Sequence, residues 1–156
     1  MQWVKVDNTF FLECNAYGAN NNKQLLHNEN GRPSVLVAKL HYHKGLHDFI
    51  IPMKSNINAS EGSANYFALP PNSRTKDGFH HGIYYVKLFP IDRSYIHPYF
   101  YDKNPYLKSI KSIIDEPQNT KKIVDACQTY LNEYEKGNRH PYTPDIDKIL
   151  EMLQQK

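Results

Sequence analysis

The sequence has 156 residues, of which 40% are hydrophobic and 22% charged, and its formal net charge is +3. This length is typical of one domain, and no glycine- or serine-rich linker divides the chain, so we expect a single domain over residues 1–156. No apolar run reaches the roughly 20 residues that are needed to cross a bilayer. The first residues also lack the order of a secretion signal, in which a basic region is followed by an apolar region and then by small residues. The sequence therefore predicts a cytoplasmic protein.

The positive charge is concentrated in the middle of the sequence. Residues 31–112 contain eleven Lys or Arg against five Asp or Glu, a balance of +6. Residues 1–30 contain two Lys or Arg against three Asp or Glu, a balance of −1. Residues 113–156 contain six Lys or Arg against eight Asp or Glu, a balance of −2. A basic centre between acidic flanks suits binding of a polyanion. The alternative is an ordinary solvated surface, because lysine-rich exteriors are common.

The first part of the chain predicts a strand, a short helix and a loop. Gln2–Val6 is typical of a strand, and the polar side chains of residues 7–9 offer oxygens that cap a brief helix. Residues 17–31 are rich in Asn and Gly with little periodicity, which predicts a long surface loop or a loop that holds one helical turn. Such loops often carry function, so Tyr17 at its base is a candidate functional residue.

A hairpin is the strongest sheet signal. Residues 34–43 alternate between an apolar face and a face that becomes basic halfway along, which predicts a strand. Lys44-Gly45 is expected to turn the chain into a second strand within residues 46–57. Pro52 cannot donate to a sheet ladder, so this strand should end or meet a sheet edge there.

The residues after Pro52 are the candidate phosphate-binding group. Lys54, Ser55 and Asn56 carry an ammonium, a hydroxyl and an amide, all of which donate hydrogen bonds to phosphate oxygens. Antiparallel pairing brings the start of one strand beside the end of the next, so Arg32 is expected near Lys54 and Ser55. The alternative is a polar strand end followed by an ordinary turn.

The middle of the chain predicts two more strands around a loop. Tyr66–Leu69 and Gly82–Phe89 are typical of strands, and residues 72–81 between them predict a mobile basic loop. Residues 90–105 interleave aromatic and basic side chains, which can stack bases and hold phosphates of single-stranded RNA. The alternative is that these aromatics seal one end of the core.

The last third predicts helices over residues 105–115 and 120–136, and a final helix that begins at Thr143-Pro144-Asp145 and runs to Leu153. Strands followed by helices indicate an α+β fold, with helices packed on an antiparallel sheet.

Several enzyme classes are discounted, because the sequence has no glycine-rich nucleotide loop, no HExxH and no G-x-S-x-G elbow. Cys14 and Cys127 match no metal spacing, which predicts buried thiols. A zinc site of His41, His43 and His47 is a weaker alternative, since a turn separates the last two. RNA cleavage without a metal needs only groups that hold the phosphate, offset its charge and move protons, because the ribose 2′-hydroxyl is the nucleophile.

The order Gly31-Arg32-Pro33, a long apolar strand, a turn and then FIIPMKSNI resembles the endoribonuclease toxins of type III toxin–antitoxin systems, the ToxN/AbiQ group and especially its TenpN-like branch. The resemblance covers residues 30–58, and beyond them only element order and length. It implies that Arg32, Lys54 and Ser55 line the cleavage site. Relatives carry Thr-Ser-Pro-Lys where this chain has Lys-Ser-Asn-Ile, so the later family lysine has no direct match.

The resemblance implies a compact, twisted antiparallel sheet related to MazF/Kid-like barrels, with no cofactor. The implied reaction is transesterification of a cellular mRNA to a 2′,3′-cyclic phosphate and a 5′-hydroxyl. The implied partner is a small repeat RNA that folds as a pseudoknot, inhibits the toxin and can bridge a hetero-oligomer, in a system that aborts phage infection.

Other polar and aromatic residues are expected to bind RNA: Tyr17, Lys39, His41, His43, Asn56, Arg74, Lys76, His80, His81, Lys87, Arg93 and Tyr95. A non-catalytic RNA-binding module would use the same basic centre without needing Lys54 and Ser55 together.

Overall fold

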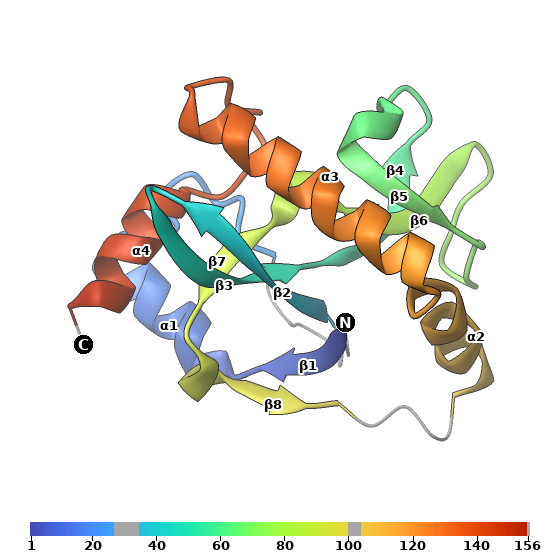
Figure 1. Cartoon of the computed structure of the whole chain (residues 1–156), viewed down its shortest axis with the longest axis horizontal. Coiled ribbons are helices and arrows are strands. Elements are labelled where there is room, and N and C mark those ends of the chain that lie inside the picture. The colour runs from blue at the N-terminus through green and yellow to red at the C-terminus, as the bar shows by residue number, and fades with distance from the viewer. Residues whose placement is uncertain (27–34, 100–103, 156) are drawn as a thin grey trace.

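The computed structural model describes residues 1–26, 35–99 and 104–155. Its described elements are two antiparallel sheets, four α-helices and short 3₁₀ turns (Figure 1). The strands are β1 (Gln2–Val6), β2 (Val35–Tyr42), β3 (Gly45–Ile51), β4 (Met53–Asn58), β5 (Tyr66–Leu69), β6 (Phe79–Tyr84), β7 (Phe89–Ile91) and β8 (Ile96–Pro98). The helical elements are α1 (Asn8–Tyr17), η2 (Ser63–Asn65), η3 (Tyr85–Lys87), η4 (Arg93–Tyr95), α2 (Pro105–Ile114), α3 (Pro117–Glu135) and α4 (Ile146–Gln154). The expected α+β class, with a helical C-terminal third, is confirmed.

The larger sheet has the strand order β7-β3-β2-β1-β8. Its central hairpin, β2–β3, runs from the pair Leu36 and Ile51 to the pair Tyr42 and Gly45. The expected turn at Lys44-Gly45 is therefore displaced by one residue. His43 and Lys44 form it, with φ of 48° and 62°. Positive φ at both central residues is the geometry of a type I′ turn, whose twist matches that of the flanking strands.

The chain passes from one sheet to the other at Pro52. Strand β3 ends at Ile51, as the proline predicts, and the alternative of an ordinary turn after it is wrong. The chain stays extended through β4, which pairs with β6 in a smaller sheet of order β4-β6-β5. Burial of Ile57, which is 1% exposed, favours this second pairing over a solvated turn.

Strand β6 begins earlier than the sequence predicts. The expected loop over residues 72–81 ends at Gly78, and His80 and His81 already belong to the strand. The expected strand Gly82–Phe89 is interrupted, because the chain makes the turn η3 before β7 joins the larger sheet. Pairing with β4 and β5 holds the two histidines in a strand that their local sequence does not favour.

Helices cover both faces of the larger sheet. On one face, Leu36 and Leu40 of β2 pack in a cluster with Ile123 and Leu131 of α3, which crosses the sheet in Figure 1. On the other face, β2 and β3 pack in a second cluster with α1 and α4. Both cysteines are buried free thiols, as expected. In the part of the chain that the structure describes, no helix has the length and apolar character needed to cross a membrane.

Candidate functional site

A β-bulge lies at the residues that the sequence singles out. Lys54 pairs with Gly82 and Ile57 with His80, so Ser55 and Asn56 together stand opposite the single residue His81. We call Lys54–Asn56 the β4 bulge. Bulges bend a strand, redirect its side chains and are over-represented beside active sites. Strand β4 is an edge strand of the smaller sheet, so no described strand pairs with its outer side.

Ser55 and Asn56 face the loop that precedes β6. The Asn72 amide donates a hydrogen bond to Ser55 Oγ at 2.9 Å. Asn56 Oδ1 accepts from the Lys76 backbone N–H at 2.7 Å, and Asn56 Nδ2 donates to the Arg74 carbonyl at 3.0 Å. The loop is thus tied to β4 by side-chain bonds, which corrects the expectation of a mobile segment.

Lys54 lies on the other face of the smaller sheet. Its Nζ is 5.3 Å from the centroid of the Tyr84 ring, a cation–π contact. The Tyr84 hydroxyl donates a hydrogen bond to Glu61 at 2.9 Å. Burial is the larger cause, and this bond the next, that raises the pKa of Tyr84. Neighbouring strand residues point to opposite faces, so Lys54 and Ser55 approach a common ligand only around the free edge of β4.

The positive charge around the bulge is uncompensated. Lys54, Arg74 and Lys76 have no carboxylate within ion-pair distance among the described residues. Arg74 and Lys76 are exposed. His80 is also exposed, and its ring stacks on Tyr66 with centroids 5.8 Å apart. The arrangement offers cations and hydrogen-bond donors at the β4 edge, with an aromatic pair on β5 and β6 of the same sheet.

Arg32, the third residue expected at the cleavage site, lies outside the described residues. The described start of β2 is beside the end of β3, since Leu36 pairs with Ile51. The nearness of Arg32 to Lys54 and Ser55 stays a prediction.

Other predicted binding residues lie away from the β4 bulge. Lys39 on β2 and Arg93 in the turn η4 both pair with Asp48 of β3, at 3.3 and 3.2 Å. Tyr17 is on α1, where Lys148 Nζ lies 5.1 Å from its ring centroid. The helix α1 and the smaller sheet stand at opposite ends of the molecule in Figure 1.

His41 and His43 lie at the far end of the β2–β3 hairpin, also away from the bulge. Gln128 of α3 accepts from the His41 N–H at 2.8 Å and donates to its carbonyl at 2.9 Å, so this backbone is satisfied. His43 Nε2 lies 3.2 Å from Asp147.

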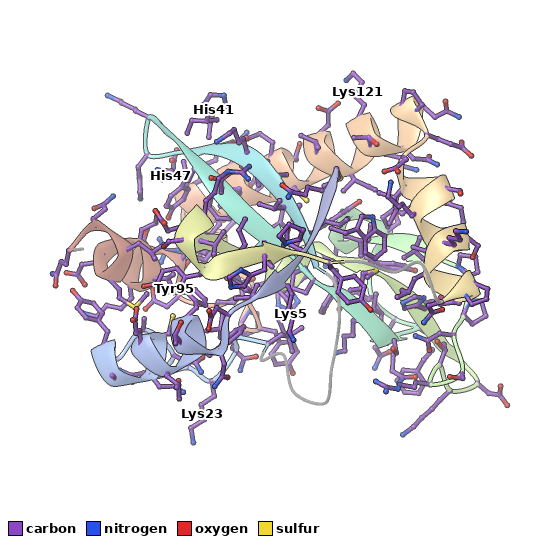
Figure 2. The ribbon with its side chains drawn as sticks, turned by 90° about the horizontal axis from the view of Figure 1, so that it is seen from below. Lys5, Lys23, His41, His47, Tyr95 and Lys121 are labelled. Carbon is purple, nitrogen blue, oxygen red and sulfur yellow. The ribbon has the colours of Figure 1, made fainter. Side chains whose placement is uncertain are left out.

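Three predicted RNA contacts are buried, and their assignment to an exposed binding surface is wrong. His81, Lys87 and Tyr95 are 5%, 8% and 6% exposed. Tyr95 donates a hydrogen bond to Glu13 of α1 and lies in the interior in Figure 2, which supports the expectation that some aromatics seal the core. Sequence alone does not distinguish these residues from exposed ones, because each has a polar end that a buried partner can satisfy.

Lys87 is held inside by a carbonyl and an amide. Its Nζ donates to the Gln24 carbonyl at 3.1 Å and to Gln24 Oε1 at 2.7 Å. Burial lowers the pKa of Lys87 to about 8, with a smaller contribution from the positive charge of Lys54. The ammonium thus joins the loop after α1 to η3.

The alternative zinc site does not form. Leu40 pairs with His47 and Leu46 with His41, so the two histidines point to opposite faces of the hairpin, as Figure 2 shows. Among the described residues, no group of three His, Cys, Asp or Glu side chains is placed to hold a metal ion.

Asn72, Tyr66 and Tyr106 contact the residues of the candidate site but were not predicted from the sequence. Asn72 Oδ1 accepts from the Arg74 N–H at 2.9 Å and from the Thr75 hydroxyl at 3.0 Å, forming a local turn. An Asn that opens a polar loop is a recognised turn signal, so this residue was within reach of sequence reasoning. Tyr66 and Tyr106 join the site only through tertiary contacts.

No protein-family model matches the chain. No curated protein matches it either. Two solved structures are similar over nearly the whole chain. The first concerns a bacterial antiviral system regulated by a processed non-coding RNA; it has 15% identity, a TM-score of 0.70, and the match covers 100% of this chain and 99% of that one.

The second concerns the mechanism of bacterial type III toxin–antitoxin systems, with selective toxin inhibition by a non-coding RNA pseudoknot. It has 12% identity and a TM-score of 0.65, and the match covers 99% of this chain and 96% of that one. At these identities the likeness concerns the fold. Over its full length, this chain has the ToxN-like fold of the toxins of bacterial type III toxin–antitoxin systems.

Proposed function

We propose that the chain is a metal-independent endoribonuclease toxin of a type III toxin–antitoxin system. The observation that carries the proposal is the β4 bulge, where Ser55 and uncompensated cations meet at a free sheet edge. The full-length likeness to toxins of such systems supports the same function.

Cleavage would use the substrate's own 2′-hydroxyl as nucleophile. The Ser55 oxygen already accepts a hydrogen bond from Asn72, which leaves its O–H free to donate to a phosphoryl oxygen. The Lys54 ammonium reaches the same phosphate around the edge of β4 and offsets the charge that builds on its oxygens. Attack then expels the 5′-oxygen and leaves a 2′,3′-cyclic phosphate.

Arg74 and Lys76 would bind the phosphates that flank the scissile one in a cellular mRNA. Asn56 binds the Arg74 carbonyl and the Lys76 N–H, so the backbone that carries both side chains is held beside the bulge. The half-buried Tyr66 and the exposed His80, whose rings stack on each other, would stack an unpaired base on the smaller sheet.

The proposed inhibitor is a small repeat RNA that folds as a pseudoknot and covers the β4 bulge. The neighbour whose toxin is inhibited by an RNA pseudoknot supports this partner. The same uncompensated cations would bind substrate and inhibitor, so the two RNAs should compete.

The test is incubation of the purified protein with total bacterial RNA, with and without EDTA, followed by analysis of the new ends. We expect cleavage in both samples, with 5′-hydroxyl and 2′,3′-cyclic phosphate termini. Binding without cleavage would indicate a non-catalytic RNA-binding module. Cleavage that EDTA abolishes and metal restores would reject the metal-independent mechanism.

A further inference from the structure

His81 stands at the centre of the site, yet its burial excludes the role of a cationic RNA contact. It lies opposite the β4 bulge, on the face of β6 shared with Ser55 and Asn56. Its ring is 5% exposed, and burial lowers its pKa, so the imidazole is neutral at neutral pH. A neutral imidazole in such a place either supports the fold or transfers a proton.

The contacts of the ring decide which nitrogen carries the proton. His81 Nδ1 lies 2.9 Å from the Pro70 carbonyl and 2.6 Å from the Tyr106 hydroxyl. The Tyr106 hydroxyl also lies 2.6 Å from the Pro70 carbonyl. A carbonyl oxygen only accepts hydrogen bonds. An unprotonated Nδ1 would therefore place its lone pair against a lone pair of the Pro70 oxygen, and the two would repel each other. All three contacts are satisfied when Nδ1 carries the hydrogen and Tyr106 donates to Pro70.

This tautomer leaves Nε2 with a free lone pair. Among the described residues, the hydrogen bonds of the ring are made through Nδ1. Pro70 follows β5 on one side of β6, whereas the β4 bulge is on the other side. With Nδ1 turned to Pro70, the opposite edge of the ring is directed away from β5 and toward the bulge.

We propose that His81 is the general base of RNA cleavage, with Nε2 as the proton acceptor and the Pro70 carbonyl fixing its tautomer. This inference rests on the proposed ribonuclease function and names a catalytic residue for it. The 2′-hydroxyl gives its proton to Nε2 while the 2′-oxygen forms a bond to phosphorus. The bond from phosphorus to the 5′-oxygen breaks, and that oxygen keeps the electron pair and takes a proton from water. The imidazolium then returns its proton to the hydroxide so formed.

The surroundings suit a base that is charged only briefly. The Pro70 carbonyl accepts from Nδ1 and so stabilises the imidazolium formed during attack, while burial returns the ring to the neutral form. The titratable groups around the ring are Tyr106 of α2, Lys54 on the far face of β4, and the charged loop residues Arg74, Lys76 and Asp77. Tyr106 is the one that contacts the ring, and burial raises its pKa to about 12, so it stays neutral.

The test uses His81→Asn, whose amide can donate toward Pro70 as Nδ1–H does but has no basic nitrogen. Single-turnover cleavage of a randomised oligoribonucleotide pool is followed across pH. For the wild type we expect the rate to rise with pH on the acid side, with an apparent pKa below the ordinary 6.5. His81→Asn should lower the rate by about 10²- to 10⁴-fold and flatten the acid limb, with RNA affinity unchanged.

His97→Asn is the control, because His97 is an exposed histidine of β8 in the larger sheet, outside the candidate site, and its loss should leave the rate and the acid limb unchanged. Wild-type rate and pH profile in His81→Asn would overturn the base assignment. A wild type that cuts no RNA would instead remove the proposed function itself. Nitrogen NMR of the wild type decides the tautomer even if the variant does not fold: protonated Nδ1 is expected, and protonated Nε2 would overturn the proposal.

Discussion

Lys54 and Ser55 are adjacent along β4 but belong to opposite faces of the smaller sheet. The Lys54 ammonium lies over the Tyr84 ring at 5.3 Å, whereas Ser55 Oγ accepts a hydrogen bond from Asn72 at 2.9 Å. In the proposed mechanism both side chains bind one phosphate around the edge of β4, so each should contribute separately to catalysis.

Lys54→Ala and Ser55→Ala are each expected to lower RNA cleavage on the order of a hundredfold or more, because each removes a group that offsets developing charge. Growth inhibition on expression should be lost, and thermal unfolding should change little. Lys121→Ala is the control, since this α3 lysine has a 78% exposed side chain and pairs only with Asp125. Undiminished cleavage by both site variants would refute the assignment.

Cleavage is expected to persist in EDTA. The described histidines and carboxylates form no three-ligand group, and the 2′-hydroxyl mechanism needs no metal. The measurement is the single-turnover rate before and after dialysis against chelator. Complete loss, with recovery on addition of zinc, would contradict the prediction.

RNA affinity should fall nearly linearly on a plot of log affinity against log salt, at roughly 0.7 per phosphate contacted on a single strand. Arg74→Ala and Lys76→Ala should each reduce that slope by about 0.7, because neither cation has a described carboxylate partner. Lys39→Ala is the control and should change the slope less, since Lys39 pairs with Asp48 at 3.3 Å. Titrating a repeat RNA encoded upstream at several salt concentrations measures this, and a flat response would reject the partner.

Asn56→Ala should loosen the loop that carries Arg74 and Lys76. It removes two hydrogen bonds, of 2.7 and 3.0 Å, and each is worth about 1 kcal/mol or less at an exposed site. We expect a small loss of stability but a clear loss of hydrogen-exchange protection at the Lys76 amide. Asn8→Ala on α1 is the control, and unchanged protection in Asn56→Ala would show that other contacts order the loop.

Lys87 should make stability depend on pH above neutrality. Its pKa is about 8 in the folded chain against the ordinary value of 10.5, so between these values the unfolded chain binds more protons. The free energy of unfolding should therefore rise with pH in that window, by at most about 1.4 kcal/mol per pH unit. Below pH 8 the buried Lys87 is charged, and the full cost of burying this charge lowers the free energy of unfolding. The difference between wild type and Lys87→Met isolates this term, and a difference independent of pH would contradict it.

The sequence by itself determined the local structure wherever one physical signal dominated. Asp7 caps α1 through a 3.0 Å bond to the Thr9 N–H, and Pro52 ends β3 because it lacks a donor. The alternation of residues in β2 and the apolar spacing of α2 and α3 likewise marked their buried faces. These signals act between residues a few positions apart, so they are readable along the chain.

Tertiary structure decided where the polar side chains go. His81 and Lys87 are the same kinds of residue as exposed His80 and Lys76, but β4, β5 and the Gln24 loop close over them. The β4 bulge arises because two residues of one strand meet a single residue of another that lies far along the sequence. Pairing across such separations depends on the whole fold. For that reason the sequence singled out Lys54, Ser55 and Asn56 as a group, while only the fold divided Lys54 and Ser55 between two faces of a sheet and placed His81 opposite the bulge.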